Sequence, residues 1–219
     1  MPIVFGQVGA PSSTSSADST NLPLLQGKQG EGVVAELHGK YYTQAYRNNA
    51  FIGATAAGGV VPPNYSTTAQ TFGIWNPAGS GKNAILIAVD FGLVTLGTPA
   101  VSSLALSYTP NAGSSLATGQ ISAITTAAPV AAIVGNTAAS VCRFTPSAAT
   151  TLASTFLMPL PFSYFSTTTT TVATFASQLL HYDFDGSVGV APNNAIWVCA
   201  NILTGSTWNI SLRWYEAPV

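Results

Sequence analysis

The sequence predicts an all-β fold, and three observations support this prediction. About ten short segments rich in β-branched and aromatic residues follow one another after residue 32, each bounded by Pro, Gly or Asn. Apolar and polar residues alternate along the last of them, "TWNISLRWYEAP" (207–218). The stretch most open to a helical interpretation, "PSAATTLASTF" (146–156), allows at most one short helix. Short strands with regular turn signals are typical of an antiparallel sandwich or barrel.

The first 32 residues are predicted to form an extended N-terminal arm. They are rich in Ser, Gly, Pro, Gln and Thr, and their apolar content is too sparse for a core element. Such a segment is either an unstructured tail or an arm that docks on a neighbouring subunit, and its two apolar clusters favour the arm. The predicted interface residues of the arm are Ile3, Val4, Phe5, Leu22, Leu24 and Leu25.

Residues 33–219 are predicted to form a single β domain. The strand segments expected in chain order are 35–55, 70–75, 84–96, 102–110, 119–127, 140–146, 155–165, 170–186, 195–204 and 207–218. In the last of these, Trp208, Ile210, Leu212 and Trp214 share one face, and Asn209, Ser211, Arg213 and Tyr215 share the other. This period of two predicts one buried face and one wet face. The segment 84–96 is apolar on both faces, which predicts a second covered surface, supplied by a contact between subunits.

The chain carries very little charge. Only 6% of its 219 residues are Asp, Glu, Lys or Arg, against roughly 25% in an average soluble domain. A protein that gives up charge loses the repulsion that keeps proteins apart. The composition therefore fits a Thr- and Ser-coated β protein or, as we favour, a subunit covered by its neighbours. The net charge of −1 and six scattered basic residues argue against nucleic-acid binding.

The tetrapeptide "GSGK" (79–82) raises the possibility of a phosphate-binding loop. Such a loop needs a hydroxyl residue after the Lys and leads from a strand into a helix. Here Asn83 follows Lys82, and the next residues are typical of a strand. We therefore interpret "NPAGSG" (76–81) as the turn of a β-hairpin.

Cys142 and Cys199, the two cysteines, both stand in apolar strand-like segments. Free cysteines in such surroundings behave as small hydrophobic residues. A disulfide between them is possible, but nothing in the sequence requires one. The start of the chain does not resemble a signal peptide and no apolar run suits a membrane helix, so we expect synthesis in a cytoplasm.

Candidate catalytic and metal-binding groups are few. His181, Asp183 and Asp185 alternate in "HYDFDG" (181–186) and could share one face of a strand, but a wet strand face that runs into a turn explains them more simply. No "GxSxG" motif occurs, and few carboxylates are available for glycoside hydrolysis. We expect no enzymatic activity, no metal and no cofactor. Among the aromatic residues, Trp75 is the one that we expect to be an exposed contact, whereas Trp197, Trp208 and Trp214 have the spacing of core residues.

Two stretches carry a resemblance to a known group of proteins. The closing segment, "DFDGSVGVAPNNAIWVCANILTGSTWNISLRWYEAPV" (183–219), and "NPAGSGKNAILIAVDFG" (76–92) resemble jelly-roll virion proteins of tailed bacteriophages, of the head decoration or cement type. The likeness extends over about residues 33–219. Pro192-Asn193 stands where that group would have Pro-Gly. The resemblance implies a jelly-roll-like two-sheet antiparallel β-sandwich, and a trimeric subunit that holds neighbours together on a capsid lattice.

The combined expectation is a non-enzymatic capsid decoration or cement subunit that stabilises a capsid through subunit contacts and its arm. Its expected partners are its own copies, as a homotrimer, and a major capsid protein. We expect no nucleic acid, membrane or small-molecule substrate as a partner, and a location on the capsid surface of a virion after synthesis in a host cytoplasm. The alternative is a β-sandwich carbohydrate-binding or host-adhesion module of a phage tail or spike.

Overall fold

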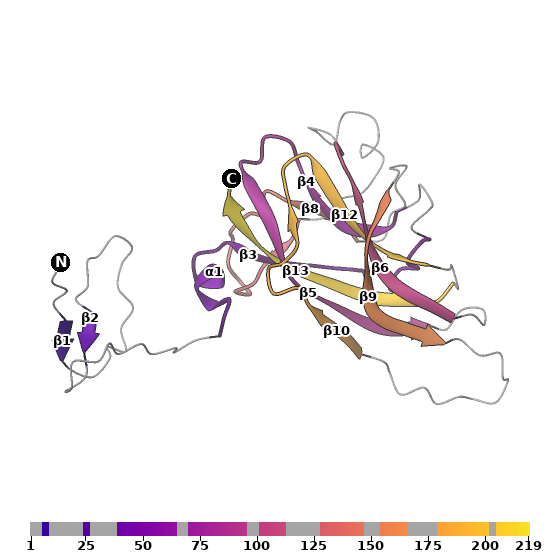
Figure 1. Ribbon diagram of the computed structural model, residues 1–219, viewed down its shortest axis with the longest axis horizontal. Coiled ribbons are helices and arrows are strands. Elements are labelled where there is room, and N and C mark those ends of the chain that lie inside the picture. The colour runs from indigo at the N-terminus through magenta and orange to yellow at the C-terminus, as the bar shows by residue number, and fades with distance from the viewer. Residues whose placement is uncertain are drawn as a thin grey trace. The chain divides into compact units, whose positions relative to one another are not determined.

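The computed structural model describes residues 6–8, 24–26, 39–64, 70–95, 101–112, 128–146, 154–165, 179–201 and 205–219. The chain divides into two compact units, residues 1–42 and 43–219. In the first unit, β1 (Gly6–Val8) and β2 (Leu24–Gln26) pair in parallel, with Gly6 opposite Leu24 (Figure 1). Leu24 and Leu25 therefore lie in a strand. The other predicted arm residues (Ile3, Val4, Phe5 and Leu22) and the predicted boundary at residue 32 lie outside the described residues.

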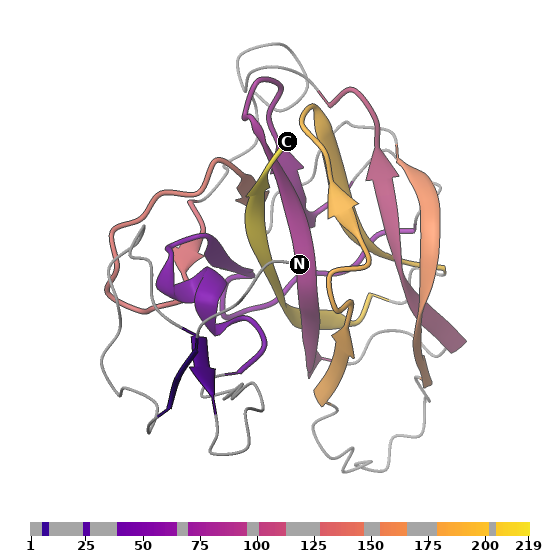
Figure 2. The ribbon, with the colours of Figure 1, turned by 60° about the vertical axis from the view of Figure 1, so that its left-hand side comes forward.

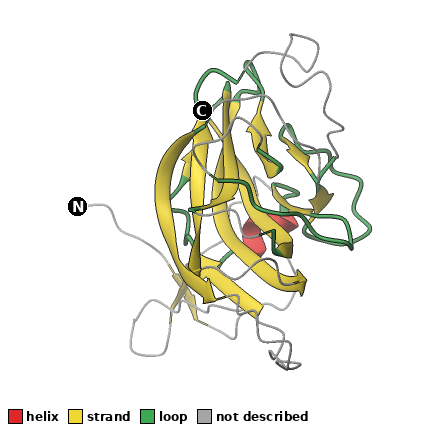
Figure 3. Ribbon diagram, turned by 90° about the vertical axis from the view of Figure 1, so that its right-hand side faces the viewer, coloured by secondary structure: helices red, strands yellow, loops and turns green. Residues whose placement is uncertain are grey.

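The second unit contains two antiparallel sheets that face each other (Figures 1 and 3). The first sheet has the order β10-β5-β13-β3-β7, with β11 also paired to β5, and the second has the order β8-β4-β12-β6-β9. The main strands are β3 (Ala50–Ala54), β4 (Phe72–Asn76), β5 (Lys82–Thr95), β6 (Val101–Thr109), β9 (Thr155–Phe165), β10 (Leu179–Asp183), β12 (Asn194–Ala200) and β13 (Thr207–Pro218). The short strands are β7 (Val130–Ala131), β8 (Arg143–Thr145) and β11 (Gly189–Val190).

The order of the main strands is that of a jelly roll. Numbered one to eight along the chain, they run first, eighth, third, sixth in one sheet and second, seventh, fourth, fifth in the other. All pairs between them are antiparallel. The predicted fold class, a jelly-roll-like two-sheet antiparallel β-sandwich, is confirmed.

The core lies between the two sheets and follows the alternation seen in the sequence. Trp208, Ile210, Leu212 and Trp214 of β13 are all buried, whereas the residues between them are exposed or half-buried. Trp208 packs edge to face on Phe91 of β5, with ring centroids 6.4 Å apart, and such aromatic pairs add to the stability gained by burial alone. The predicted inner and outer faces of this strand are confirmed.

One predicted strand is partly a helix. The segment 35–55 is predicted to be a strand, but within its described residues, 39–55, Tyr42–Tyr46 forms a short helix, α1, and Ala50–Ala54 forms strand β3. The amide of Arg47 donates to the carbonyl of Thr43, and Asn48 then adopts a positive φ of 60°, which ends the helical turn. Tyr42 and Tyr46 stand four residues apart, a spacing that places them on one side of the helix.

The loop at residues 77–81 is a turn, as predicted, but it does not close a hairpin. Gly79 and Gly81 have positive φ angles, and the amide of Ser80 donates to the carbonyl of Pro77. However, β4 belongs to the second sheet and β5 to the first, so the loop passes between the sheets. Lys82 begins strand β5 rather than a helix, so the backbone here lacks the helix N-terminus on which a phosphate-binding loop depends.

Strand β9 forms the outer edge of the second sheet, and among the described strands it pairs with β6. It contains Pro159 and Pro161. Its register with β6 is irregular between Pro159 and Ser163, as is common where a proline removes an N–H group from a strand. Proline is tolerated within a sheet on an edge strand. Both prolines thus mark the free edge of the sheet.

Candidate functional site

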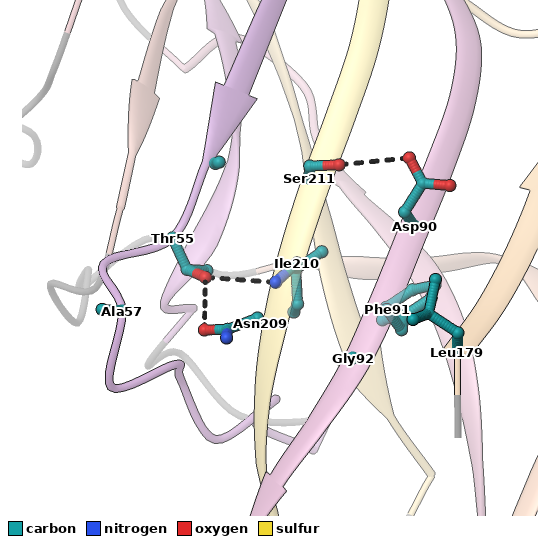
Figure 4. Close-up of a pocket in the computed structure, with 10 residues that line it drawn as sticks. Thr55, Ala57, Asp90, Phe91, Gly92, Leu179, Asn209, Ile210 and Ser211 are labelled. Atoms are coloured by element: carbon teal, nitrogen blue, oxygen red, sulfur yellow. Dashed lines mark hydrogen bonds between the residues drawn. The ribbon is translucent and has the colours of Figure 1, made fainter. Parts of the chain in front are cut away.

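A trough of about 360 Å³ lies on the first sheet and crosses several of its strands (Figure 4). Small residues at its surface (Ala54, Ala57, Gly92 and Ser211) leave room above the sheet. Leu179, at the start of β10, also lines the trough and is 78% exposed. The trough therefore exists because small residues stand on neighbouring strands at positions where larger side chains would fill it.

Hydrogen bonds of polar side chains, with one another and with the backbone, lie along the trough. The hydroxyl of Thr55 accepts a hydrogen bond from the backbone amide of Ile210 at 3.1 Å and lies 3.5 Å from Oδ1 of Asn209 (Figure 4). On β13, Ser211 donates to the carboxylate of Asp90 at 3.2 Å. These contacts connect the Thr55 loop to β13 and β13 to β5, so they fix the walls of the trough.

Asp90 is also the centre of a charged cluster on the outer face of this sheet. Arg213 donates to both of its carboxylate oxygens, at 2.9 and 3.2 Å, and Nδ1 of His181 lies 2.6 Å from Oδ1. The three residues come from β5, β13 and β10, and the sheet register places them side by side. The positive guanidinium offsets the charge of the carboxylate, which leaves the trough without a strong field.

This cluster does not have the arrangement of a hydrolytic triad. A catalytic serine must be bonded to a histidine, which an acid then orients. Here Ser211 donates to Asp90, and His181 is bonded to that same carboxylate. The hydroxyl therefore has a carboxylate rather than a histidine as its partner, which is not the order of a Ser-His-Asp triad.

The alternating residues of "HYDFDG" lie where the simpler interpretation placed them. His181 and Asp183 are exposed on β10, and Asp185-Gly186 forms a turn with positive φ angles at both residues. Asp183 accepts the backbone amide of Asp185 at 2.9 Å, an arrangement typical of turns. Within the described ranges, no group of three or more His, Cys, Asp or Glu residues could hold a metal ion.

The prediction that Trp75 is an exposed contact is wrong. Trp75 is only 4% exposed, and all five residues of β4 are buried, so both faces of this strand are covered. In the second sheet it stands opposite Arg143 on one side and Ala195 on the other. The side chain of Trp75 thus offers no surface to a partner of the folded subunit.

A buried carboxylate that the sequence interpretation missed holds the end of β13 to another part of the chain. Glu216 is 1% exposed, and its Oε1 accepts hydrogen bonds from the hydroxyl of Ser140 and from the backbone amides of Val141 and Cys142. Its Oε2 lies 3.3 Å from Nζ of Lys82. The signal was present in the sequence, because Glu216 continues the inward alternation of Trp208 to Trp214.

Most charged side chains in the described part of the sandwich are engaged in contacts within the chain. Lys82 pairs with Glu216, and Arg213 pairs with Asp90. Arg143 donates to the backbone carbonyls of Ser140 and Cys142, at 2.8 and 3.0 Å. Most of the described charges therefore contribute to contacts within the chain, and their small number leaves the surface weakly charged.

Both cysteines are free and buried, so the possible disulfide between them does not form. Burial raises the pKa of Cys199 to about 11. Burial, followed by the charge of Glu216 and a hydrogen bond to it, raises the pKa of Cys142 further still. The thiolate is the reactive form, so raised pKa values reduce the reactivity of both residues.

We expect neither thiol to react with a thiol reagent such as 5,5′-dithiobis(2-nitrobenzoate) while the protein is folded. At pH 8 a group with the pKa of Cys199 is roughly one part in a thousand thiolate. Unfolding returns both thiols to ordinary pKa values, and both should then react within minutes. Absorbance at neutral to mildly basic pH, with and without denaturant, measures this. Rapid reaction of the folded protein would contradict the described burial.

The chain matches no protein-family model, no curated protein and no solved structure. Helix α1, with five residues, falls far short of a membrane crossing, and the described residues hold no helix that meets the requirement. Fold and site geometry are therefore the basis for a functional proposal.

Proposed function

We propose that this protein is a non-enzymatic structural subunit of a virion, which decorates a capsid and stabilises it through contacts between subunits and through its N-terminal arm. The observation that carries the proposal is the low charge of the chain, 6% of its residues, together with the pairing of charges within the chain by Lys82–Glu216 and, on the outer face of the first sheet, by Arg213–Asp90. A neutral surface lacks the repulsion that keeps soluble proteins apart. Such a surface suits a subunit that is covered by neighbours.

Two further observations support assembly. Several large apolar side chains are exposed on the sandwich, among them Val134 at 86% and Leu179 at 78%. The jelly roll is also a fold of viral capsid proteins, although it serves lectins as well, and a fold alone does not fix a function. The expected partners are further copies of the chain and a major capsid protein, on the capsid surface.

The alternative, a carbohydrate-binding or host-adhesion module, has less support. Its sequence argument rested on an exposed Trp75, which is buried. The trough in Figure 4 has one aromatic residue among those that line it, Phe91, and this ring is buried in the core. Sugar rings commonly stack on exposed aromatic faces, and this trough has none among its lining residues.

We expect deletion of residues 1–32 to leave the sandwich folded and to abolish attachment to the capsid. The chain divides into two compact units, and the described core residues of the sandwich belong to the second of them. Cosedimentation with capsids that lack the protein measures attachment, and circular dichroism with thermal unfolding verifies the fold. Undiminished cosedimentation of the truncated protein would overturn the role of the arm. Binding of the protein to a glycan array, with no binding to capsids, would favour the alternative function.

A further inference from the structure

A rigid apolar turn projects from the sandwich next to β7. The amide of Asn136 donates to the carbonyl of Ile133 at 3.1 Å, and Gly135 has a φ of 91°, which defines a tight turn. Val134 at its tip is 86% exposed, and Ile133 and Val130 beside it are 41% and 57% exposed. We call Val130, Ile133 and Val134 the apolar knob.

The knob is held in place by polar contacts at its base. The side-chain amide of Asn136 donates to Oδ1 of Asn48, and Oδ1 of Asn136 accepts the backbone amide of Ala138 at 3.0 Å. The amide of Ala132 donates to the carbonyl of Ala50 at 2.9 Å. A loop whose backbone is already held in place loses little conformational freedom when it binds a partner. The knob therefore has the properties of a preorganised anchor.

An apolar hollow of about 210 Å³ lies beside β6 and β9. Its lining includes Tyr108, Leu157, Val190, Ala191, Ala195 and Ile196. Tyr108 and Leu157 are partly exposed, as is the neighbouring Phe156. A cavity of about 150 Å³ lined by apolar side chains is enough to hold benzene, so this hollow has room for a branched aliphatic side chain.

Knob and hollow lie on different strands of the sandwich. The knob follows β7, the last strand of the first sheet on one side, whereas the residues that line the hollow come from β6, β9, β11, β12 and the loop at Ala191. In the described part of the chain, none of these strands pairs with β7. Figure 2 shows β7 and β9 at opposite margins of the sandwich. The knob of one copy therefore cannot fill the hollow of the same copy, but it can fill that of a second copy.

We propose that the apolar knob of one copy inserts into the apolar hollow of the next, so that the chain assembles head to tail. Two different surfaces meet in such a heterologous contact, and repetition closes a ring when the rotation permits. No charged residue belongs to the knob or to the lining of the hollow, so neither side loses the hydration of a charge. This inference rests on the proposed function, which names a second copy of the chain as a partner. It specifies the two surfaces, knob and hollow, through which the copies make contact.

Paired cysteine substitutions test the proposal. Val134→Cys with Leu157→Cys in one chain, treated with a short bismaleimide, should give covalently linked multimers on a denaturing gel. Each single variant alone should stay unlinked, and an equal mixture of the two single variants should give linked dimers and nothing larger. The native cysteines are buried and do not contribute. Val94→Cys with Leu157→Cys is the matched control, because Val94 is exposed but belongs to neither surface.

Several results would overturn the proposal. One is a double variant that stays unlinked, and another is a Val134→Cys variant that links to itself as efficiently as the double variant does. A wild-type protein that is monomeric by light scattering at about 100 μM would also overturn it, as would a Val134→Asp variant with the native mass of the wild type. Capsid cosedimentation of Val134→Asp distinguishes this proposal from the proposed function. A variant that no longer self-associates but still cosediments with capsids supports the role of the knob. The proposed role in capsid decoration is tested separately, by the deletion of residues 1–32.

Discussion

Replacement of Glu216 by Ala is expected to lower the free energy of unfolding by about 3–5 kcal/mol, the range found when one partner of a buried charged network is removed. The carboxylate is fully buried, and it accepts hydrogen bonds from Ser140, Val141 and Cys142. Its loss leaves buried donors without an acceptor and releases the segment before β8 from the end of β13. Denaturant unfolding followed by tryptophan fluorescence measures the change.

Lys82→Ala is the matched control for this prediction. The side chain of Lys82 is 33% exposed and meets the same carboxylate at 3.3 Å. Without the cation, Oε2 of the buried carboxylate loses its charged partner while the three donors to Oε1 remain, so the expected loss is about 1–3 kcal/mol, smaller than that of Glu216→Ala. If the two variants were equally destabilised, the ion pair rather than the backbone amides would be the main function of Glu216.

Replacement of Gly73 by Ala is expected to destabilise the protein by at least ~3 kcal/mol, at the upper end for overpacking. A Cβ at this position would lie 2.1 Å from the carbonyl oxygen of Ile196 and 2.4 Å from the indole of Trp197. The nearest obstacle is backbone of the central strand β12, which cannot move without disturbing its pairs with β4 and β6. Thermal and denaturant unfolding measure the loss.

Gly92→Ala provides the comparison for Gly73. A Cβ there would meet only the Cβ of Asn209, at 3.9 Å. With this ordinary contact, the lower entropy of the unfolded chain should leave stability unchanged or raise it by about 0.4–1 kcal/mol. Equal losses for both variants would mean that the intrinsic preference for glycine, and not the approach of β12, explains Gly73.

The parts of the fold that follow from local pattern were predicted well. The expected strands at 155–165 and 207–218 coincide with β9 and β13, because proline, aromatic and alternation signals all lie within these segments. The turn at 77–81 was also correct. The predicted hairpin topology was wrong, because the same turn residues occur both in hairpins and in loops that cross between sheets. Which of the two forms depends on which strands, distant in sequence, pair with each other.

The functional features show the same division between local and distant information. Glu216 could have been placed inside by alternation alone. By contrast, the cluster of Asp90, His181 and Arg213 joins three strands that are far apart in the sequence. The exposure of Trp75 was misjudged for the same reason, because both faces of β4 are covered in the folded domain, which depends on parts of the chain distant in sequence. No signal near these residues in the sequence contains that information.

The two prolines of β9 disfavour one kind of polymer, the kind that grows by adding strands to this sheet edge. A long, free sheet edge can recruit strands from other molecules without limit, which leads to fibres. Pro159 and Pro161 remove the donors that such growth would need from the middle of that edge. Copies brought together at high density therefore lack these donors for adding strands at the edge formed by β9. Growth of an amyloid-like filament through this edge should be suppressed, and contacts there fall to side chains.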